Sequence, residues 1–394
     1  MKKAIHAFLI AGFIAISTWT PAFSQQLEIH TIDVGQGASE LIIGPSGTTV
    51  LVDGGTSSKG RWELLPYLNT IFPPENRTLD YVIASHDDGD HYGGLNYILD
   101  NGYSANNIYH CGYNSGFGRG VPIPIGTVID LGGGARVTCV LVNGYLIDGS
   151  HVNVGTKNNA SIGLLIEYGD FDYITAGDLG SSVEDDLAQV LVTYINPPDH
   201  PYHPNEPYLD PQYGVDVMHP NHHGSRYSTS TTYVNLLRCE VAAINGGTGY
   251  SHPTQDAVDR LLGRQFYTCS CCSAYGEPTG VTVPAAEVYR TTPEPDPGDP
   301  DCERATEEDC PTISDIIVKY GGGSSYSVEG ASMGVSYRNV DENGSSPLPV
   351  PLTWPMFRHD PARTGASPFW GPRAAELKWS YNLGLGTEWS YSSP

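Results

Sequence analysis

The sequence predicts an α/β fold of the αββα type, in which two β-sheets pack face to face and helices cover both outer faces. Two halves of the chain each contain strand patterns followed by helical patterns. Each half also contains a hairpin signal. In both halves carboxylates or histidines follow the strand ends, which is where α/β folds place their ligands.

The first half is built around a short, densely charged stretch, SHDDGDHYGG, at residues 85–94. A short apolar strand precedes it and a helical pattern follows it, so we expect a loop at the carboxyl end of a strand. The elements expected in this half are a strand from Leu27, a hairpin over 40–55 that turns at 44–47, a strand over 79–85 and a helix from Gly93.

The second half repeats this arrangement, and its strands end at Asp178, at His222 and at Asn245. The glycine and proline content, 46 and 30 residues, indicates many turns around these elements. The expected elements are a hairpin over 161–178, a helix over 181–195, a strand over 215–225, a helix over 231–239, a strand over 240–245, a helix over 253–262 and a final hairpin over 315–330.

The chain begins with the features of a secretory signal peptide. Lys2 and Lys3 precede an apolar run over 7–16, and small residues lead up to a cleavage site after Ser24. The alternative is a membrane anchor, but the run is short for a span, and no later stretch is apolar enough to cross a bilayer. We therefore expect a secreted or periplasmic mature protein.

The predicted organisation has four segments, with two insertions in the largest. Residues 194–213 are proline-rich, and residues 268–312 contain an acidic, proline-rich stretch. The segments are a signal peptide over 1–24, a hydrolase-like domain over 25–338, a linker over 339–353 and a distinct tail over 354–394.

Eight cysteines in an exported chain predict disulfides, although spacing does not give their pairing. A zinc knuckle at Cys269-Ser270-Cys271-Cys272 is an alternative. We expect Cys302 and Cys310 to hold the acidic insertion. Cys111, Cys139 and Cys239 are scattered along the chain.

The formal charge is −24, and loss of Lys2 and Lys3 with the signal peptide makes it −26. Such a surface repels polyanions, which argues against tight binding of long nucleic acid. A small-molecule or phosphodiester substrate remains compatible with this charge, and the oligomeric state is not predicted.

The charged stretch predicts a metal site. Carboxylates repel one another at this density, and a divalent cation removes that cost. In the extended order His86, Asp88, Asp90, alternating residues point to one side, and His91 adds a ligand where the helix begins. Asp178, His222 and His252 lie at or just after later strand ends and can complete the cluster. Because carboxylates are numerous, Mn²⁺ is a rival to Zn²⁺, as one or two ions.

Seven short motifs occur in an order that resembles the metallo-β-lactamase superfamily, and within it the hydrolase domain of ComEC-type competence proteins. The resemblance covers about residues 27–338 and implies an αββα fold with the metal at the edge between the sheets. The motifs are DVGQG at 33–37, VLVDGG at 50–55, SHDDGDHYGG at 85–94, NNAS at 158–161, TAGD at 175–178, HHGS at 222–225 and SHP at 251–253.

This resemblance implies a role for each candidate residue. His86 and Asp88 correspond to ligands of a first metal, Asp90 and His91 to ligands of a second, and Asp178 to a bridge. His222 corresponds to a further ligand of the second metal, with His223 as an adjacent alternative. His252 corresponds to a residue that contacts metal or a developing negative charge. The superfamily usually has histidines where this chain has Asp88 and the segment 158–161.

The implied reaction is hydrolysis by a metal-bound hydroxide, because a bound divalent cation lowers the pKa of water towards neutrality. Asp90 would orient the hydroxide, and the second metal or His252 would stabilise the oxyanion. The resemblance favours a phosphodiester or nucleic-acid-derived substrate. The alternatives are a lactone or β-lactam, or a non-catalytic envelope scaffold. No serine-hydrolase, P-loop or dinucleotide motif occurs in a strand-to-helix context.

Several other groups receive weaker expectations. His30 is expected to be a packed strand residue, His200 and His203 loop residues, and His219 a neighbour of the ligands. Asp33 and Asp53 are either turn residues or supports of the site. Residues 354–384 resemble the opening of a quinoprotein-like β-propeller, and the tail is expected to be a truncated part of one.

Overall fold

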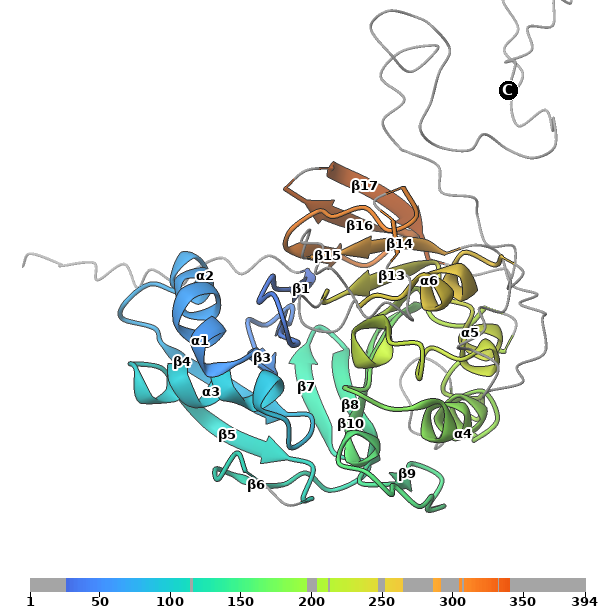
Figure 1. The fold of residues 1–394 in the computed structure, drawn as a ribbon, viewed down its shortest axis with the longest axis horizontal. Helices are drawn as coiled ribbons and strands as arrows, with labels where there is room; N and C mark the ends of the chain where they lie inside the picture. The colour runs from blue at the N-terminus through green and yellow to red at the C-terminus, as the bar shows by residue number, and fades with distance from the viewer. Residues whose placement is uncertain are drawn as a thin grey trace, which may run out of the picture.

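Two β-sheets packed face to face form the centre of the molecule, as the sequence predicts (Figure 1). The structure is a computed structural model and describes residues 26–113, 116–196, 204–211, 213–246, 252–264, 286–291, 305–306, 308–331 and 333–340. Within these residues the first sheet has nine strands and the second has eight. The fold is the αββα sandwich.

The first sheet runs in the order β17-β16-β15-β1-β2-β3-β4-β5-β6. Its centre is antiparallel from β15 to β3, and β3, β4 and β5 run parallel. Its strands are β1 (Leu27–Thr31), β2 (Glu40–Ile43), β3 (Thr49–Val52), β4 (Thr78–Ala84), β5 (Ser104–His110), β6 (Val121–Pro122), β15 (Ile316–Tyr320), β16 (Ser325–Gly330) and β17 (Gly334–Asn339).

The second sheet runs in the order β14-β13-β12-β11-β10-β8-β7, with β9 paired to β8. The hairpin β10–β11 is antiparallel, whereas β11, β12, β13 and β14 are parallel. Its strands are β7 (Val128–Gly132), β8 (Ala135–Val142), β9 (Tyr145–Leu146), β10 (Ile162–Tyr168), β11 (Phe171–Thr175), β12 (Val217–Met218), β13 (Val241–Ile244) and β14 (Glu287–Arg290).

Helices cover the two outer faces separately, as Figure 1 shows. Leu68 and Leu95 pack with Leu41 and Val82 on the outer face of the first sheet, and Leu187 and Val258 lie in the apolar cluster of the second. The helices are α1 (Ser57–Lys59), the π-helical turn η1 (Gly60–Leu64), α2 (Leu65–Ile71), α3 (Gly89–Asp100), the 3₁₀ turns η2 (Asn158–Ala160) and η3 (Asn221–Gly224), α4 (Ser181–Leu191), α5 (Thr231–Leu237) and α6 (Gln255–Leu261).

The main core lies between the two sheets. Ile29, Val50 and Ile83 of the first sheet meet Val137 and Ile166 of the second, and all five are fully or almost fully buried. Burying such side chains contributes about 1.5–3 kcal/mol each relative to exposure. The same strands turn alternate residues to their outer faces, so three apolar layers result. This arrangement leaves the strand ends at one edge free to carry polar side chains.

Helix α3 begins at Gly89 rather than at the predicted Gly93. Asp88 is extended, whereas Asp90 and His91 lie in the first helical turn, so the predicted alternation fails after Asp88. An acidic residue in a first turn is favoured by the helix dipole. Gly94 lets the helix approach closely, because a Cβ there would lie 1.7 Å from the Gly54 carbonyl oxygen.

The structure contains elements that the sequence patterns do not predict, including α2, β5 and the hairpin β7–β8. In the described part of the chain Cys111, Cys139 and Cys239 are buried free thiols. None of the described helices is long and apolar enough to cross a bilayer. Predictions that lie outside the described residues concern the signal peptide over 1–24, most of the linker over 339–353, the tail over 354–394, His200, His203, Cys269, Cys271, Cys272 and Cys302.

Candidate metal centre

Strand ends from both sheets deliver the predicted ligands to one edge of the sandwich. His86 follows β4 in the first sheet, and Asp90 and His91 begin the helix after it. Asp178 follows β11 in the second sheet, and His222 and His223 follow β12. β4 runs parallel to its neighbours β3 and β5, and β11 runs parallel to β12. Parallel strands bring their carboxyl ends to the same edge, which is why residues far apart in sequence meet here.

Asp178 lies at the centre of this cluster, and each of its carboxylate oxygens faces two histidines. Oδ1 lies 3.2 Å from His91 Nε2 and 3.6 Å from His223 Nε2. Oδ2 lies 3.8 Å from His86 Nε2 and 3.6 Å from His222 Nε2. Four histidine nitrogens thus surround one carboxylate. His222 is partly exposed, with 27% of its side chain accessible, whereas the other three histidines are buried.

Two overlapping groups of potential ligands have atoms within 4.8 Å of one another among the described residues. The first is His86, His91 and Asp178, and the second is Asp90, His91 and His223. The second group contains His223 rather than His222, the neighbour to which the sequence resemblance gave the ligand role.

The donor atoms fit a metal ion. The Nε2 atoms of His86, His91 and His223 are buried and form no hydrogen bond with any described residue. Leaving buried polar atoms unsatisfied is costly, so such atoms in a cluster indicate a missing partner. Two ligands on one tetrahedral zinc, each about 2.1 Å from the ion, lie about 3.4 Å apart. The separations around Asp178, 3.2 to 3.8 Å, match this spacing.

Two members of the cluster, Asp178 and His223, are held in the protonation states that bind metal. Burial alone would raise the pKa of Asp178, yet His91, His223, His222 and His86 together hold it well below its usual range. Burial lowers the pKa of His223 to about 4, so its imidazole is neutral at neutral pH. His91 differs, because Asp178 and Asp53 outweigh its burial and raise its pKa. A metal would displace that proton.

Asp53 holds the two histidines of the first sheet in place. It is buried, and its Oδ2 accepts a hydrogen bond from His91 Nδ1 at 2.7 Å, so that Nε2 of His91 faces the cluster. Asp53 also accepts hydrogen bonds from the Ser85 amide at 2.8 Å and the Ser85 hydroxyl at 2.6 Å. The same hydroxyl lies 3.1 Å from His86 Nδ1. Of the two roles left open for Asp53, the structure thus favours support of the site over a simple turn.

The loop that carries His222 and His223 has an unusual backbone. Both histidines adopt left-handed conformations, with φ of 52° and 56°. Such conformations are uncommon for residues other than glycine and persist only where the surroundings enforce them. Buried Glu184 of α4 holds both flanks of this loop, because it accepts hydrogen bonds from Asn221 Nδ2 at 2.8 Å and from the amides of Thr229 and Ser230 at 2.9 and 2.6 Å.

The remaining predicted residues lie at or near the cluster. Asp88 Oδ2 lies 3.4 Å from His86 Nε2, and Asp88 Oδ1 pairs with Lys157. Asp90 Oδ2 accepts a hydrogen bond from Gln36 at 3.2 Å. The ring of buried His252 lies 5.3 Å from that of His222. His219 lies outside both ligand groups, beside Thr175 and Glu40 at 3.3 and 3.7 Å.

Comparison with known proteins identifies the fold family. The model of the Metallo-beta-lactamase superfamily matches residues 32–110, the segment that carries Asp53, His86 and His91. Residues 32–110 thus match this superfamily, and the αββα fold agrees with the match. The matched segment contains the strand, loop and helix that supply the ligands from the first sheet, as the sequence resemblance implied.

Two curated proteins are similar to this chain. Recombination protein 2 of Haemophilus influenzae is 27% identical over 248 residues, which are 59% of this chain and 26% of that protein. ComE operon protein 3 of Bacillus subtilis is 23% identical over 293 residues, 66% of this chain and 34% of that protein. The chain thus matches about a quarter to a third of the length of these relatives.

Two solved structures are also similar. Igni18, a metallo hydrolase from Ignicoccus hospitalis, is 16% identical with a TM-score of 0.33, covering 57% of this chain and 83% of that one. A metal-dependent hydrolase described as putative, from Parabacteroides distasonis, is 12% identical with a TM-score of 0.34, covering 56% of this chain and 81% of that one.

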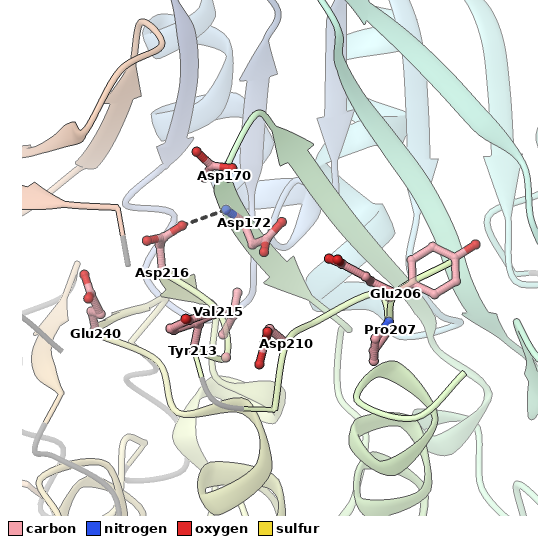
Figure 2. A pocket seen from close by; sticks show the side chains of 11 residues that line it. Asp170, Asp172, Glu206, Pro207, Asp210, Tyr213, Val215, Asp216 and Glu240 are labelled. Atoms are coloured by element: carbon pink, nitrogen blue, oxygen red, sulfur yellow. Dashed lines mark hydrogen bonds between the residues drawn. The ribbon is translucent and has the colours of Figure 1, made fainter. Parts of the chain in front are cut away.

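The described part of the chain also contains a cavity of about 410 Å³ away from the candidate metal centre. Figure 2 shows it beside Asp170 and Asp172, at the start of β11, whereas Asp178 follows the other end of that strand. Its lining includes the carboxylates of Asp170, Asp172, Glu206, Asp210, Asp216 and Glu240.

The sequence analysis does not single out three supporting residues of the candidate metal centre: Ser85, Lys157 and Glu184. Ser85 directly precedes His86, and Lys157 directly precedes the NNAS motif. Their positions beside these motifs could have marked them as neighbours of the site. Glu184 lies on a helix 37 residues before Asn221. Nothing in the local pattern marks Glu184 as different from the acidic residues that follow it.

Proposed function

We propose that this chain is an exported metal-dependent hydrolase that cleaves phosphodiester bonds in small or nucleic-acid-derived substrates. The observation that carries the proposal is the set of buried histidine Nε2 atoms around Asp178, which lack hydrogen-bond partners among the described residues. When bound, a divalent cation would supply a nucleophile from water near neutral pH and a positive charge for the developing oxyanion. His86, His91, Asp178, His223 and Asp90 would hold it.

The residues at the open side of the cluster have the properties that hydrolysis needs. Asp90 is only partly buried, and although burial would raise its pKa, His91 and His223 hold that pKa below its ordinary value. It therefore stays ionised and can accept a proton from the attacking water at a carboxylate oxygen. His222 is partly exposed and adjoins His252, so these two side chains can face a substrate oxygen.

The preference for phosphodiesters rests on the resemblance to ComEC-type competence proteins. The formal charge of −24 favours small esters over long nucleic acids, because a polyanion is repelled by the surface as a whole. Export rests on the signal-peptide pattern of residues 1–24.

The test is turnover of a chromogenic phosphodiester, bis(p-nitrophenyl) phosphate, by purified protein loaded with Zn²⁺ or Mn²⁺. Nitrocefin and a lactone are assayed beside it. We expect phosphodiester turnover that falls at least about 100-fold in Asp178→Asn and Asp90→Ala. Asp130→Asn is the matched control, because Asp130 is exposed and caps a turn at Gly132.

Two other outcomes would reject the proposed substrate. Turnover of nitrocefin or the lactone without the phosphodiester would support the alternative hydrolase class. Metal binding with no turnover of any of the three, in wild type as in the variants, would support a metal-stabilised scaffold.

A further inference from the structure

The two ligand groups of the metal centre share one nitrogen atom. His91 belongs to both groups. Its Nδ1 is committed to Asp53 at 2.7 Å, so Nε2 alone is available to a metal. An imidazole nitrogen has one lone pair and binds one ion. The two groups therefore cannot both bind an ion through His91, and one ion at His91 Nε2 and Asp178 has His86, His223 and Asp90 nearby.

A second ion bound at His86 would lie beside Asp88, the other carboxylate next to that histidine. Its Oδ2 lies 3.4 Å from His86 Nε2, yet Asp88 belongs to neither ligand group of the described residues. Its other oxygen, Oδ1, forms an ion pair and hydrogen bond with the ammonium of Lys157. Asp88 is thus already neutralised by a cation that the chain itself provides.

Lys157 is held at this position by the fold. It directly precedes η2 (Asn158–Ala160), which is fixed by the hydrogen bond from Gly180 N to Asn159 Oδ1 at 2.9 Å and by that from Asp178 N to Ser161 Oγ at 3.1 Å. The segment that carries Lys157 is therefore tied to the same loop as Asp178. About half of the Lys157 side chain is exposed, so its ammonium lies at the rim.

We propose that the centre binds a single divalent cation and that the ammonium of Lys157, paired with Asp88, takes the place of a second one. The proposal rests on the proposed function only in assuming that the cluster binds metal. A divalent ion beside Asp88 would be repelled by the ammonium and would have to displace it. The centre then combines one ion inside the cluster with a fixed, metal-independent positive charge at its rim.

The experiment measures metal stoichiometry rather than activity. Wild type, Lys157→Met, Lys157→Arg and the double variant Lys157→Met/Asp88→Asn are stripped with chelator and dialysed against excess Zn²⁺ or Mn²⁺. Ions per chain are then measured by elemental analysis and by calorimetric titration. Methionine keeps the length of the side chain without its charge, and arginine keeps the charge. Circular dichroism checks that each variant is folded.

We expect one ion per chain in wild type and Lys157→Arg, two in Lys157→Met, and one again in the double variant, which lacks the Asp88 carboxylate. Two ions in wild type would overturn the proposal. So would one ion in folded Lys157→Met, because Lys157 would then not exclude a second ion. One ion without hydrolysis would leave the inference standing and reject the function. Two ions per wild-type chain together with hydrolysis would reject the inference and leave the proposed function standing.

Discussion

At the level of single residues, the centre depends on one buried carboxylate that is not itself in a ligand group. Asp53 receives hydrogen bonds from His91 and from both donors of Ser85, and Ser85 in turn contacts His86. This pattern fixes which nitrogen of each ring faces the metal. Because the Ser85 hydroxyl donates to Asp53, it accepts from His86 Nδ1, which leaves the lone pair of Nε2 towards Asp178.

Asp53→Asn should weaken metal binding by about 10–100-fold, the range typical of residues that orient metal-bound histidines. Asparagine keeps the shape of the aspartate side chain. Its amide nitrogen, however, would face a group that now donates a hydrogen bond to Asp53, either His91 or Ser85. Titration of chelator-stripped protein with Zn²⁺ measures the affinity directly. Asp130→Asn serves as control because Asp130 is exposed on β7 and belongs to neither ligand group. Equal affinity in wild type and Asp53→Asn would show that Asp53 is not needed to orient His91.

The sequence predicted the residues of this centre better than their supports. Two histidines and three aspartates in six consecutive positions are unusual enough to indicate a metal, and the strand endings at Asp178 and His222 indicate which partners would join. Asp53 could not be distinguished from a turn residue, because its role depends on a contact with His91, 38 residues later. The choice between His222 and His223 was equally out of reach, since it depends on two left-handed backbone conformations.

At the level of secondary structure elements, helix α4 controls the loop after β12. Glu184 is fully buried and accepts three hydrogen bonds from that loop. Burial, the largest effect, raises its pKa to about 7, although these hydrogen bonds oppose the rise. A carboxyl whose pKa is raised in the folded state stabilises the fold below its unfolded pKa. That contribution is lost as the pH rises through the folded pKa.

The Glu184 ionisation should therefore lower the free energy of unfolding by about 3 kcal/mol between pH 4.5 and pH 8. Glu184→Gln should lose this part of the pH dependence. Urea denaturation of both proteins in chelator, at pH 5 and pH 8, gives the comparison. If the difference between wild type and variant is the same at both pH values, Glu184 is ionised throughout and the raised pKa is wrong.

Element boundaries show where the sequence patterns were insufficient. Asp90 and His91 looked like part of an extended loop, because the apolar periodicity of α3 begins only at Leu95. The helix nevertheless starts at Gly89. Gly94, one turn further along, packs closely against the backbone of Gly54 and so holds the helix against the first sheet. Such a backbone contact leaves no apolar signal in the sequence. Strands β5 and β7 were missed for a related reason, since polar residues interrupt their patterns.

At the level of the whole molecule, the metal centre joins the two sheets. His86 and His91 come from the first sheet and Asp178 and His223 from the second, so an ion bound to them links both layers. At a metal concentration 100 times the dissociation constant, binding should stabilise the folded state by about 2.7 kcal/mol. Addition of a chelator should therefore lower the melting temperature by several degrees. A folded Asp178→Asn protein should be insensitive to chelator, and an equal response in both proteins would place the stabilising metal elsewhere.

The opposite end of β11 carries an electrostatic cost. Asp172 borders the acidic cavity of Figure 2, and burial together with Glu167, Asp216 and Asp170 raises its pKa well above the ordinary value. Each unit of such a rise costs about 1.4 kcal/mol once the pH exceeds the folded pKa. The stabilising neutral form is present at acid pH and is lost as the pH rises.

Asp172→Asn should consequently stabilise the protein at neutral pH, by about 1 kcal/mol or more, and have little benefit at pH 4. The measurement is the urea midpoint of both proteins at pH 4 and pH 8, in chelator so that the metal centre does not contribute. Asp130→Asn again controls for loss of one negative charge at an exposed site. The whole chain is strongly acidic, so loss of any one negative charge could stabilise it. Such a general effect would raise the urea midpoints of both variants equally. If only Asp172→Asn gains stability at pH 8, the electrostatic cost arises at the cavity. If Asp172→Asn gains no stability at pH 8, bound cations or water already offset that cost.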